Sequence, residues 1–192
     1  MRVLCFLILV VATADLLVAS SKKAAASPAA SMARKVVHIQ ANGKLAHPSP
    51  APTVITEQEI NAYLASDAVA LPAGVQSVKL EGEPGVINGS ATIDFDKVRE
   101  GIHSSNPLLS VFSGVHDVRV ATHAYGEGGM GYVHVDSVSL DGVEVPHFVL
   151  ELFVEKYVTP RNPEIGLDSK FKLSDRIDSA TVGEHQVAVV QK

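Results

Sequence analysis

Two histidines and an aspartate stand in a pattern that could hold a metal ion. His123 and His134 lie at equal distances from a turn centred on Gly128 and Gly129, so a hairpin would place them directly opposite each other. Asp136 follows one step along the same face. Zinc accepts two imidazoles and a carboxylate, but a closed structural site takes about four ligands and the sequence supplies no fourth. We therefore expect no metal site, and a metal-assisted hydrolase at these histidines is the least favoured function.

The other motifs that could support catalysis have simpler structural interpretations. Asp94 and Asp96 project to the same side of a strand end, as acid–base pairs do, but Asp96 is expected to cap a short helix. The spacing Gly126-x-Gly128-x-x-Gly131 matches a dinucleotide-binding loop, yet a strand rather than a helix follows it. The chain contains neither a GxSxG nor an HExxH sequence. We therefore predict a protein that is not an enzyme and has no catalytic residue.

The elements that position these residues are mostly strands. Residues 115–125 and 132–140 alternate between apolar and polar side chains, which predicts an antiparallel hairpin with one dry and one wet face. A phase change near Ser137 predicts a β-bulge there. Thr56 and Glu59 match the capping box that begins a helix. Four further strands are expected at residues 75–81, 86–95, 177–182 and 187–191.

The stretch Pro146–Val158 has the most apolar helical pattern in the chain. Apolar side chains cover most of its circumference, and His147, Glu151 and Glu155 form one narrow polar stripe. A surface helix needs only a limited apolar band, so this helix requires cover on most of its sides. It is too short for a bilayer, which takes about 20 residues. We therefore predict an α+β fold in which a highly curved antiparallel sheet wraps around one long apolar helix, with a shorter N-terminal helix.

Residues 1–26 have the features of an export signal. Arg2 precedes the apolar run Val3–Ala14, and small residues at positions 24–26 offer a cleavage site. We expect export to the periplasm or cell envelope, with an uncleaved membrane anchor as the alternative. Cys5 is the only cysteine, so the mature chain would have neither a disulfide nor a thiol nucleophile.

Composition divides the rest of the chain into two parts. Residues 27–53 are rich in Ala, Ser and Pro and carry positive charge, which predicts a disordered linker. That linker could contact an anionic membrane surface or act as a plain solvated spacer. Residues 54–192 form the expected single α+β domain, in which 10 basic residues stand against 20 acidic ones. Because this domain would repel phosphates, we expect no nucleic-acid partner.

Short motifs on both sides of the apolar helix match a known group of proteins. SLDGVEVP at residues 139–146 leads into the helix, and FKLSDRIDSATVGEHQVAVVQ at residues 171–191 follows it. ITEQEINAYL at residues 55–64 and IDFD at residues 93–96 occur nearer the N-terminus. With these motifs, residues 54–191 resemble the small tubular lipid-binding (TULIP-like) domains of bacterial envelope proteins. The matching positions are Gly142, Val145, Pro146, Phe171, Leu173, Ile177 and Val189.

The resemblance implies an apolar lumen that accepts acyl chains, and it implies neither a catalytic residue nor a cofactor. We therefore expect an exported, non-catalytic protein that binds a lipid or other amphiphile, for transport or maintenance of envelope lipids. The expected walls of the lumen are Phe148, Val149, Leu152, Phe153, Tyr157, Ile60, Leu64, Ile87, Ile93, Val118, Val120, Val133 and Val135. The alternative is an envelope scaffold that has a filled core and acts through protein partners.

Overall fold

The structure is a computed structural model that describes residues 27–100, 106–160, 163 and 165–192. The expected export signal, residues 1–26, lies outside the described residues. The elements, in chain order, are α1 (Pro28–Gly43), β1 (Thr53–Thr56), α2 (Glu57–Leu64), β2 (Val75–Glu83), β3 (Val86–Asp94), α3 (Phe95–Val98), the 3-10 helix η2 (Pro107–Val111), β4 (Val115–Glu127), β5 (Met130–Leu140), β6 (Val143–Glu144), α4 (His147–Phe153), the π-helical turn η3 (Val154–Val158), β7 (Asp168–Lys172), β8 (Ile177–Gly183) and β9 (Gln186–Gln191).

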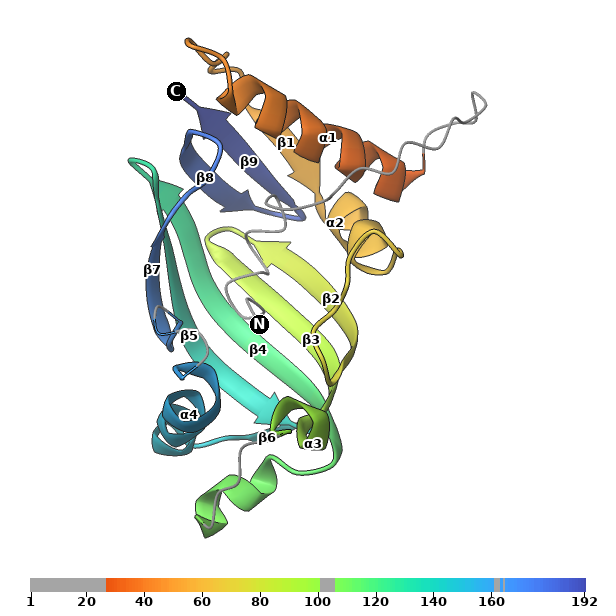
Figure 1. Cartoon of the computed structure of the whole chain (residues 1–192), viewed down its shortest axis with the longest axis vertical. Coiled ribbons are helices and arrows are strands. Elements are labelled where there is room, and N and C mark those ends of the chain that lie inside the picture. The colour runs from red at the N-terminus through yellow and green to blue at the C-terminus, as the bar shows by residue number, and fades with distance from the viewer. Residues whose placement is uncertain (1–26, 101–105, 161–162, 164) are drawn as a thin grey trace.

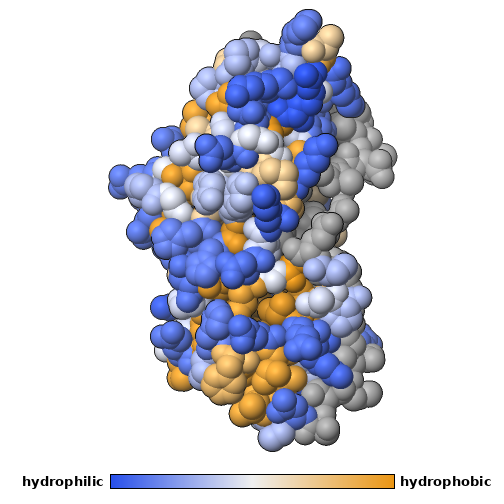
Figure 2. Space-filling model, turned by 90° about the vertical axis from the view of Figure 1, so that its left-hand side faces the viewer, coloured by the Kyte–Doolittle hydropathy of each residue, from blue (hydrophilic) through white to orange (hydrophobic). Residues whose placement is uncertain are grey.

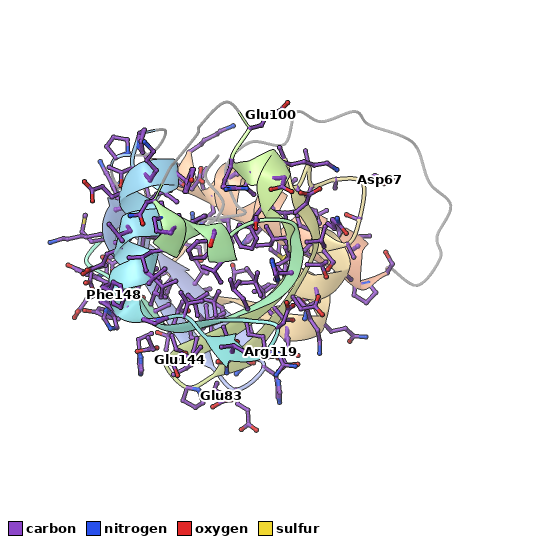
Figure 3. The ribbon with its side chains drawn as sticks, turned by 90° about the horizontal axis from the view of Figure 1, so that it is seen from below. Asp67, Glu83, Glu100, Arg119, Glu144 and Phe148 are labelled. Atoms are coloured by element: carbon purple, nitrogen blue, oxygen red, sulfur yellow. The ribbon has the colours of Figure 1, made fainter. Side chains whose placement is uncertain are left out.

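In the described residues, nine strands form one antiparallel sheet. Its main path runs β1-β9-β8-β4-β3-β2, and β5 pairs with β4, β6 and β7. The long strand β4 joins the parts, because it pairs with β3 and β5 along most of its length and with β8 at its end. Viewed from one end, the sheet is curved, with helices on its inner side and Glu83, Arg119 and Glu144 on its outer side (Figure 3).

The helices lie at the two ends of the curved sheet (Figure 1). Helices α1 and α2 lie at the end formed by β1, β8 and β9, whereas α3, η2 and α4 lie at the opposite end. No helix of the described residues crosses the middle of the inner face, between these two groups. The inner face is therefore covered at both ends by helices, while its middle is formed by β2, β3 and β4.

This arrangement contradicts the prediction of a long apolar helix wrapped by the sheet. The apolar pattern at Pro146–Val158 forms the seven-residue helix α4, which continues into the turn η3. It packs against one end of the sheet, where Val149 and Tyr157 are buried. Phe148 is 54% exposed, so the helix has one face turned to solvent.

Aromatic side chains from other elements explain why a wrapping sheet is not needed. Phe153 of α4 packs against Phe95 of α3 and Phe112 after η2, with ring centroids 5.8 and 4.2 Å apart. Its ring also lies 5.2 Å from that of Tyr157, one turn along in η3. Helical periodicity showed that the helix requires cover, but it did not show that two short helices would provide it.

Helix α1 replaces the disordered linker expected at residues 27–53. Ser27 caps the helix, and Pro28 occupies its first turn, where a missing N–H has no cost. Met32, Val36 and Ile39 follow at helical spacing and are buried in one apolar cluster with residues of β1, α2, β8 and β9. The prediction of disorder was wrong because it rested on the average composition, in which Ala and Ser dominate. The three apolar side chains form a narrow stripe on one helix face that this average does not reveal.

A buried polar network fixes the C-terminal end of α1. Asn42 Nδ2 donates a hydrogen bond to Gln191 Oε1 at 2.8 Å. Gln191 Nε2 in turn donates to the carbonyl oxygens of Ile39 at 2.8 Å and Asp175 at 2.6 Å. Because an unpaired buried amide would be costly, these bonds hold the helix in one position on β9.

A buried carboxylate joins α1 to α2. Glu59 is 8% exposed and accepts hydrogen bonds from Ser31 Oγ at 2.6 Å, Lys35 Nζ at 2.6 Å and Thr56 N at 2.8 Å. Burial raises the pKa of Glu59, but the hydrogen bonds from Lys35, Ser31 and Thr56 outweigh burial and lower it to about 2. The predicted capping box of Thr56 and Glu59 is confirmed.

Side chains of α2 cover the open edge of β2. Asn61 Nδ2 donates to the Leu80 carbonyl oxygen at 2.7 Å, and Asn61 Oδ1 accepts from Leu80 N at 2.8 Å. Glu57 Oε2 accepts from Gly82 N at 3.2 Å. An edge strand otherwise presents such groups to other chains, so α2 protects this edge against strand addition.

We predict that acid weakens the attachment of α1 through Glu59. A carboxyl whose folded pKa is lowered stabilises the fold fully above its unfolded value of 4.5, and this contribution is lost as the pH falls to about 2. The shift corresponds to about 3 kcal/mol. Urea unfolding should show Glu59→Gln less stable than the wild type at pH 7, with the difference shrinking toward pH 2.5. A difference that is the same at both pH values would contradict this role.

We predict that Asn61→Ala lowers the free energy of unfolding by about 1–3 kcal/mol, because it leaves two backbone groups of the buried residue Leu80 unpaired. Gln58→Ala is the matched control, since Gln58 is exposed on the same helix. Urea unfolding of both variants measures the effect. Equal stabilities would show that the side chain of Asn61 does not support the β2 edge.

Candidate functional site

Small and half-buried side chains form the middle of the inner face. Gly89 of β3 lies opposite Val120 of β4, and Ala91 lies opposite Val78 of β2. Directly opposed residues of antiparallel strands project to the same face of a sheet. All four are half-buried, whereas their neighbour Ser90 on the outer face is exposed. We call Val78, Gly89, Ala91 and Val120 the apolar floor.

Packed apolar clusters close both ends of the apolar floor. The cluster at the α4 end consists of Phe95, Leu109, Phe112, Val118, Val135, Val138, Leu140, Val145, Val149, Leu150, Tyr157 and Leu167. The cluster at the α2 end consists of Leu64, Leu80, Ile87, Ala124, Val133 and Val182. Val120 packs against the first cluster and Val78 against the second, so the floor is continuous with both.

Twelve of the thirteen expected lumen residues belong to these two clusters or pack against them. At the α4 end, Val118, Val135, Val149 and Tyr157 are buried, and Ile93, Val120, Leu152 and Phe153 pack around them. At the α2 end, Leu64, Ile87 and Val133 are buried, and Ile60 packs around them. The half-buried members are the ones whose apolar side chains remain partly open to a ligand on the inner face.

Phe148 is the expected lumen residue that belongs to neither cluster. It lies on the outside of α4, away from the sheet (Figure 3). On this side of the molecule, apolar side chains gather over the half that carries α4, whereas the half that carries α1 is mostly polar (Figure 2). Helix α4 therefore turns some apolar side chains toward the cluster and Phe148 toward solvent. The hydrophobic periodicity alone does not distinguish these two faces.

Arg99 and Tyr157 bring polar groups to the margin of the cluster at the α4 end. Arg99 follows α3, and its Nη2 donates to Asp96 Oδ1 at 2.7 Å. This hydrogen bond raises the pKa of Arg99, burial opposes the rise, and the Tyr157 hydroxyl adds to it. In the described residues, Tyr157 Oη and Arg99 Nε are buried and neither has a hydrogen-bond partner. The hydroxyl thus lies near the guanidinium without forming a well-directed bond to it.

Nothing in the sequence indicates this polar pair. Tyr157 was expected only as an apolar wall, and Arg99 belongs to no motif that we recognised. The two residues are 58 positions apart in the chain. Only the packing of α3 against η3 brings them together, so no local spacing could have indicated the pair.

The histidine pair lies on the outer face, as the predicted hairpin requires. His123 pairs with His134 across β4 and β5, and a register shift beside Thr122 leaves Asp136 as the extra residue of a bulge. His123 Nδ1 lies 2.8 Å from Asp136 Oδ1, and His134 Nδ1 lies 2.5 Å from Asp168 Oδ1. The predicted register and bulge are confirmed, whereas the contact with Asp168 of β7 was not foreseen.

These contacts make the histidines members of surface ion pairs. The hydrogen bond to Asp168 raises the pKa of His134, because it favours the charged imidazolium. In the part of the chain that the structure describes, no three His, Cys, Asp or Glu side chains are arranged to hold a metal ion. The geometry of these described residues therefore offers no support for the hydrolase alternative.

The carboxylates at the end of β3 have structural partners. Asp94, and not Asp96 as expected, caps α3, accepting from the backbone N–H groups of Asp96 at 3.2 Å and Lys97 at 3.3 Å. Asp96 instead pairs with Arg99. Both line an open surface pocket of about 520 Å³ together with Ala73, Lys97 and Glu100. Since Asp94 and Asp96 are engaged in a cap and an ion pair, we assign them no acid–base role.

None of the helices in the described ranges is long and apolar enough to cross a membrane.

Comparison with known proteins adds no assignment. No family model, no curated protein and no solved structure matches the chain. The resemblance to tubular lipid-binding domains therefore stays a prediction from short motifs.

Proposed function

We propose that the protein binds a single-chain lipid or similar amphiphile on the inner face of its sheet and does not catalyse a reaction. The observation that supports this most strongly is the half-buried apolar floor between two packed clusters. Water leaves such a surface when an acyl chain covers it, with a gain of about 0.8 kcal/mol for each buried methylene group. A chain of ordinary length therefore gains enough to offset the loss of its freedom.

The small side chains of the floor favour one extended chain over a bulkier ligand. Gly89 has no side chain and Ala91 only a methyl group, while Val120 and Val78 lie opposite them on the neighbouring strands. Three adjacent strands span a width of about 10 Å. This width suits a single acyl chain lying across or along the strands, bounded at its ends by α2 and α4.

An export signal at residues 1–26 would place this activity in the bacterial cell envelope. There, a protein that holds one amphiphile at a time could transport envelope lipids or maintain their balance. The membrane contact expected for residues 27–53 stays a prediction, but it would now involve the exposed side of helix α1 rather than a flexible linker.

A scaffold with a filled core is the second candidate, and one observation favours it. Seven of the thirteen expected lumen residues are buried in packed clusters, so their apolar side chains are already covered by protein. Extraction of the purified protein with organic solvent separates the two functions. Copurifying acyl species support amphiphile binding. Their absence, together with no uptake of added fatty acid, supports the scaffold.

We predict that a charge on the apolar floor abolishes binding. Ala91→Asp places a carboxylate on the inner face and should weaken uptake of a fluorescent fatty acid at least 10-fold, because the carboxylate would lose water beneath the chain. Ser90→Asp is the matched control, since it adds the same charge one residue away on the exposed outer face, opposite Arg119. Circular dichroism reports whether both variants fold.

A second pair of variants tests the same face from α4. Leu152→Asp should also abolish uptake, because Leu152 is half-buried beside the cluster at the α4 end, whereas His123→Ala on the outer face should not. Full uptake by folded Ala91→Asp and folded Leu152→Asp would refute binding on the inner face.

A further inference from the structure

We propose that Arg99 and Tyr157 bind the anionic head group of the amphiphile, an inference that rests on the function proposed above. The ligand class is a single-chain amphiphile that ends in a carboxylate or a phosphate monoester. Two buried polar atoms at the margin of the cluster at the α4 end have no hydrogen-bond partner in the described residues.

The unpaired atoms are Tyr157 Oη and Arg99 Nε. Both are buried, and neither has a hydrogen-bond partner in the described residues. Tyr157 is 0% exposed, so its hydroxyl cannot reach bulk water. Folded proteins pair nearly all of their buried polar groups, and exceptions often mark a position where a ligand or a water molecule supplies the partner.

The chemistry of the two atoms specifies the missing partner. The Nε–H group of arginine can only donate a hydrogen bond, and the tyrosine hydroxyl has a proton to donate as well. An anionic oxygen can accept both bonds, and bonds of this kind are the strong ones. Asp96 accepts a hydrogen bond from Nη2 of Arg99 at 2.7 Å, which anchors the guanidinium, while Nε–H has no acceptor in the described residues.

Arg99 remains positively charged although it is partly buried. Its hydrogen bond to Asp96 and the nearby Tyr157 hydroxyl raise the pKa of the guanidinium despite partial burial. Asp96 is exposed and binds Nη2, whereas Nε is buried, so a ligand at Nε would use a different N–H group of the same guanidinium. The head group is therefore recognised by two local donors, in a domain whose overall charge is negative.

The position of the pair connects it to the apolar floor. The Tyr157 ring lies 5.2 Å from that of Phe153. Phe153 and Val120 of the floor are both half-buried and pack against the same cluster. An acyl chain on the floor that runs toward α4 would reach Phe153 next. Its end would then lie beside Tyr157 and Arg99, so one ligand could satisfy both the apolar surface and the unpaired donors.

The test compares three ligands that share one chain but differ in head group. Oleic acid, oleoyl lysophosphatidic acid and uncharged oleyl alcohol displace the neutral fluorescent probe N-phenyl-1-naphthylamine from the full chain. We expect at least one of the two anions to bind at least 10-fold more tightly than the alcohol. Whichever anion binds more tightly identifies the source of the charge as a fatty acid or a lipid phosphate.

Variants then assign the preference to the proposed pair. Tyr157→Phe and Arg99→Gln should each weaken binding of the preferred anion about 5- to 20-fold and leave binding of oleyl alcohol within twofold, which also shows that the variants are folded. Tyr125→Phe and Arg119→Gln are matched controls, because both residues are exposed on the outer face. The controls should bind all three ligands as the wild type does.

The possible failures are distinguishable. If the alcohol binds as tightly as both anions, or if Tyr157→Phe retains full affinity for the preferred anion, the head-group site is refuted while binding on the floor stands. If neither the probe nor any of the three ligands binds, the proposed function fails and this inference fails with it.

Discussion

An apolar sheet face is unfavourable in water unless other elements cover it. The described helices cover the two ends of the inner face but not its middle, and the rest of the structure depends on this incomplete cover. Five short helical elements and one 16-residue helix lie around the ends of a nine-stranded sheet. Between them, β2, β3 and β4 present small, half-buried residues such as Gly89 and Ala91. An apolar surface of this kind favours any molecule that removes it from water, which is the physical basis for assigning it a ligand.

Local features of the fold were predictable because local physics determines them. The capping box at Thr56, the register of His123 with His134 and the bulge at Asp136 all follow from spacing within one helix or one hairpin. Contacts between distant segments were not predictable. Glu59 accepts hydrogen bonds from Ser31 and from Lys35, and nothing in the pattern of either segment indicates this pairing.

The two wrong predictions have a common cause. For Pro146–Val158, the hydrophobic periodicity indicated how much of the helix surface must be buried. For residues 27–53, the composition indicated how much apolar surface the segment could bury. Neither quantity says which partner supplies the cover. Phe95 and Phe112 supply it for α4, and the cluster around Tyr63 and Leu173 supplies it for α1. The candidate head-group pair was hidden for the same reason, since a polar group is unpaired only in relation to its neighbours in space.

Binding of an amphiphile on the inner face is tested most directly by locating the ligand on the protein. A stearic acid that carries a nitroxide on its chain broadens the methyl NMR signals of nearby Val and Leu residues. Occupation of the apolar floor predicts broadening at Val78, Val120 and Leu152, with no effect at the exposed residues Val37 and Val143. Broadening confined to exposed residues, or no broadening at all, would contradict a ligand on the inner face.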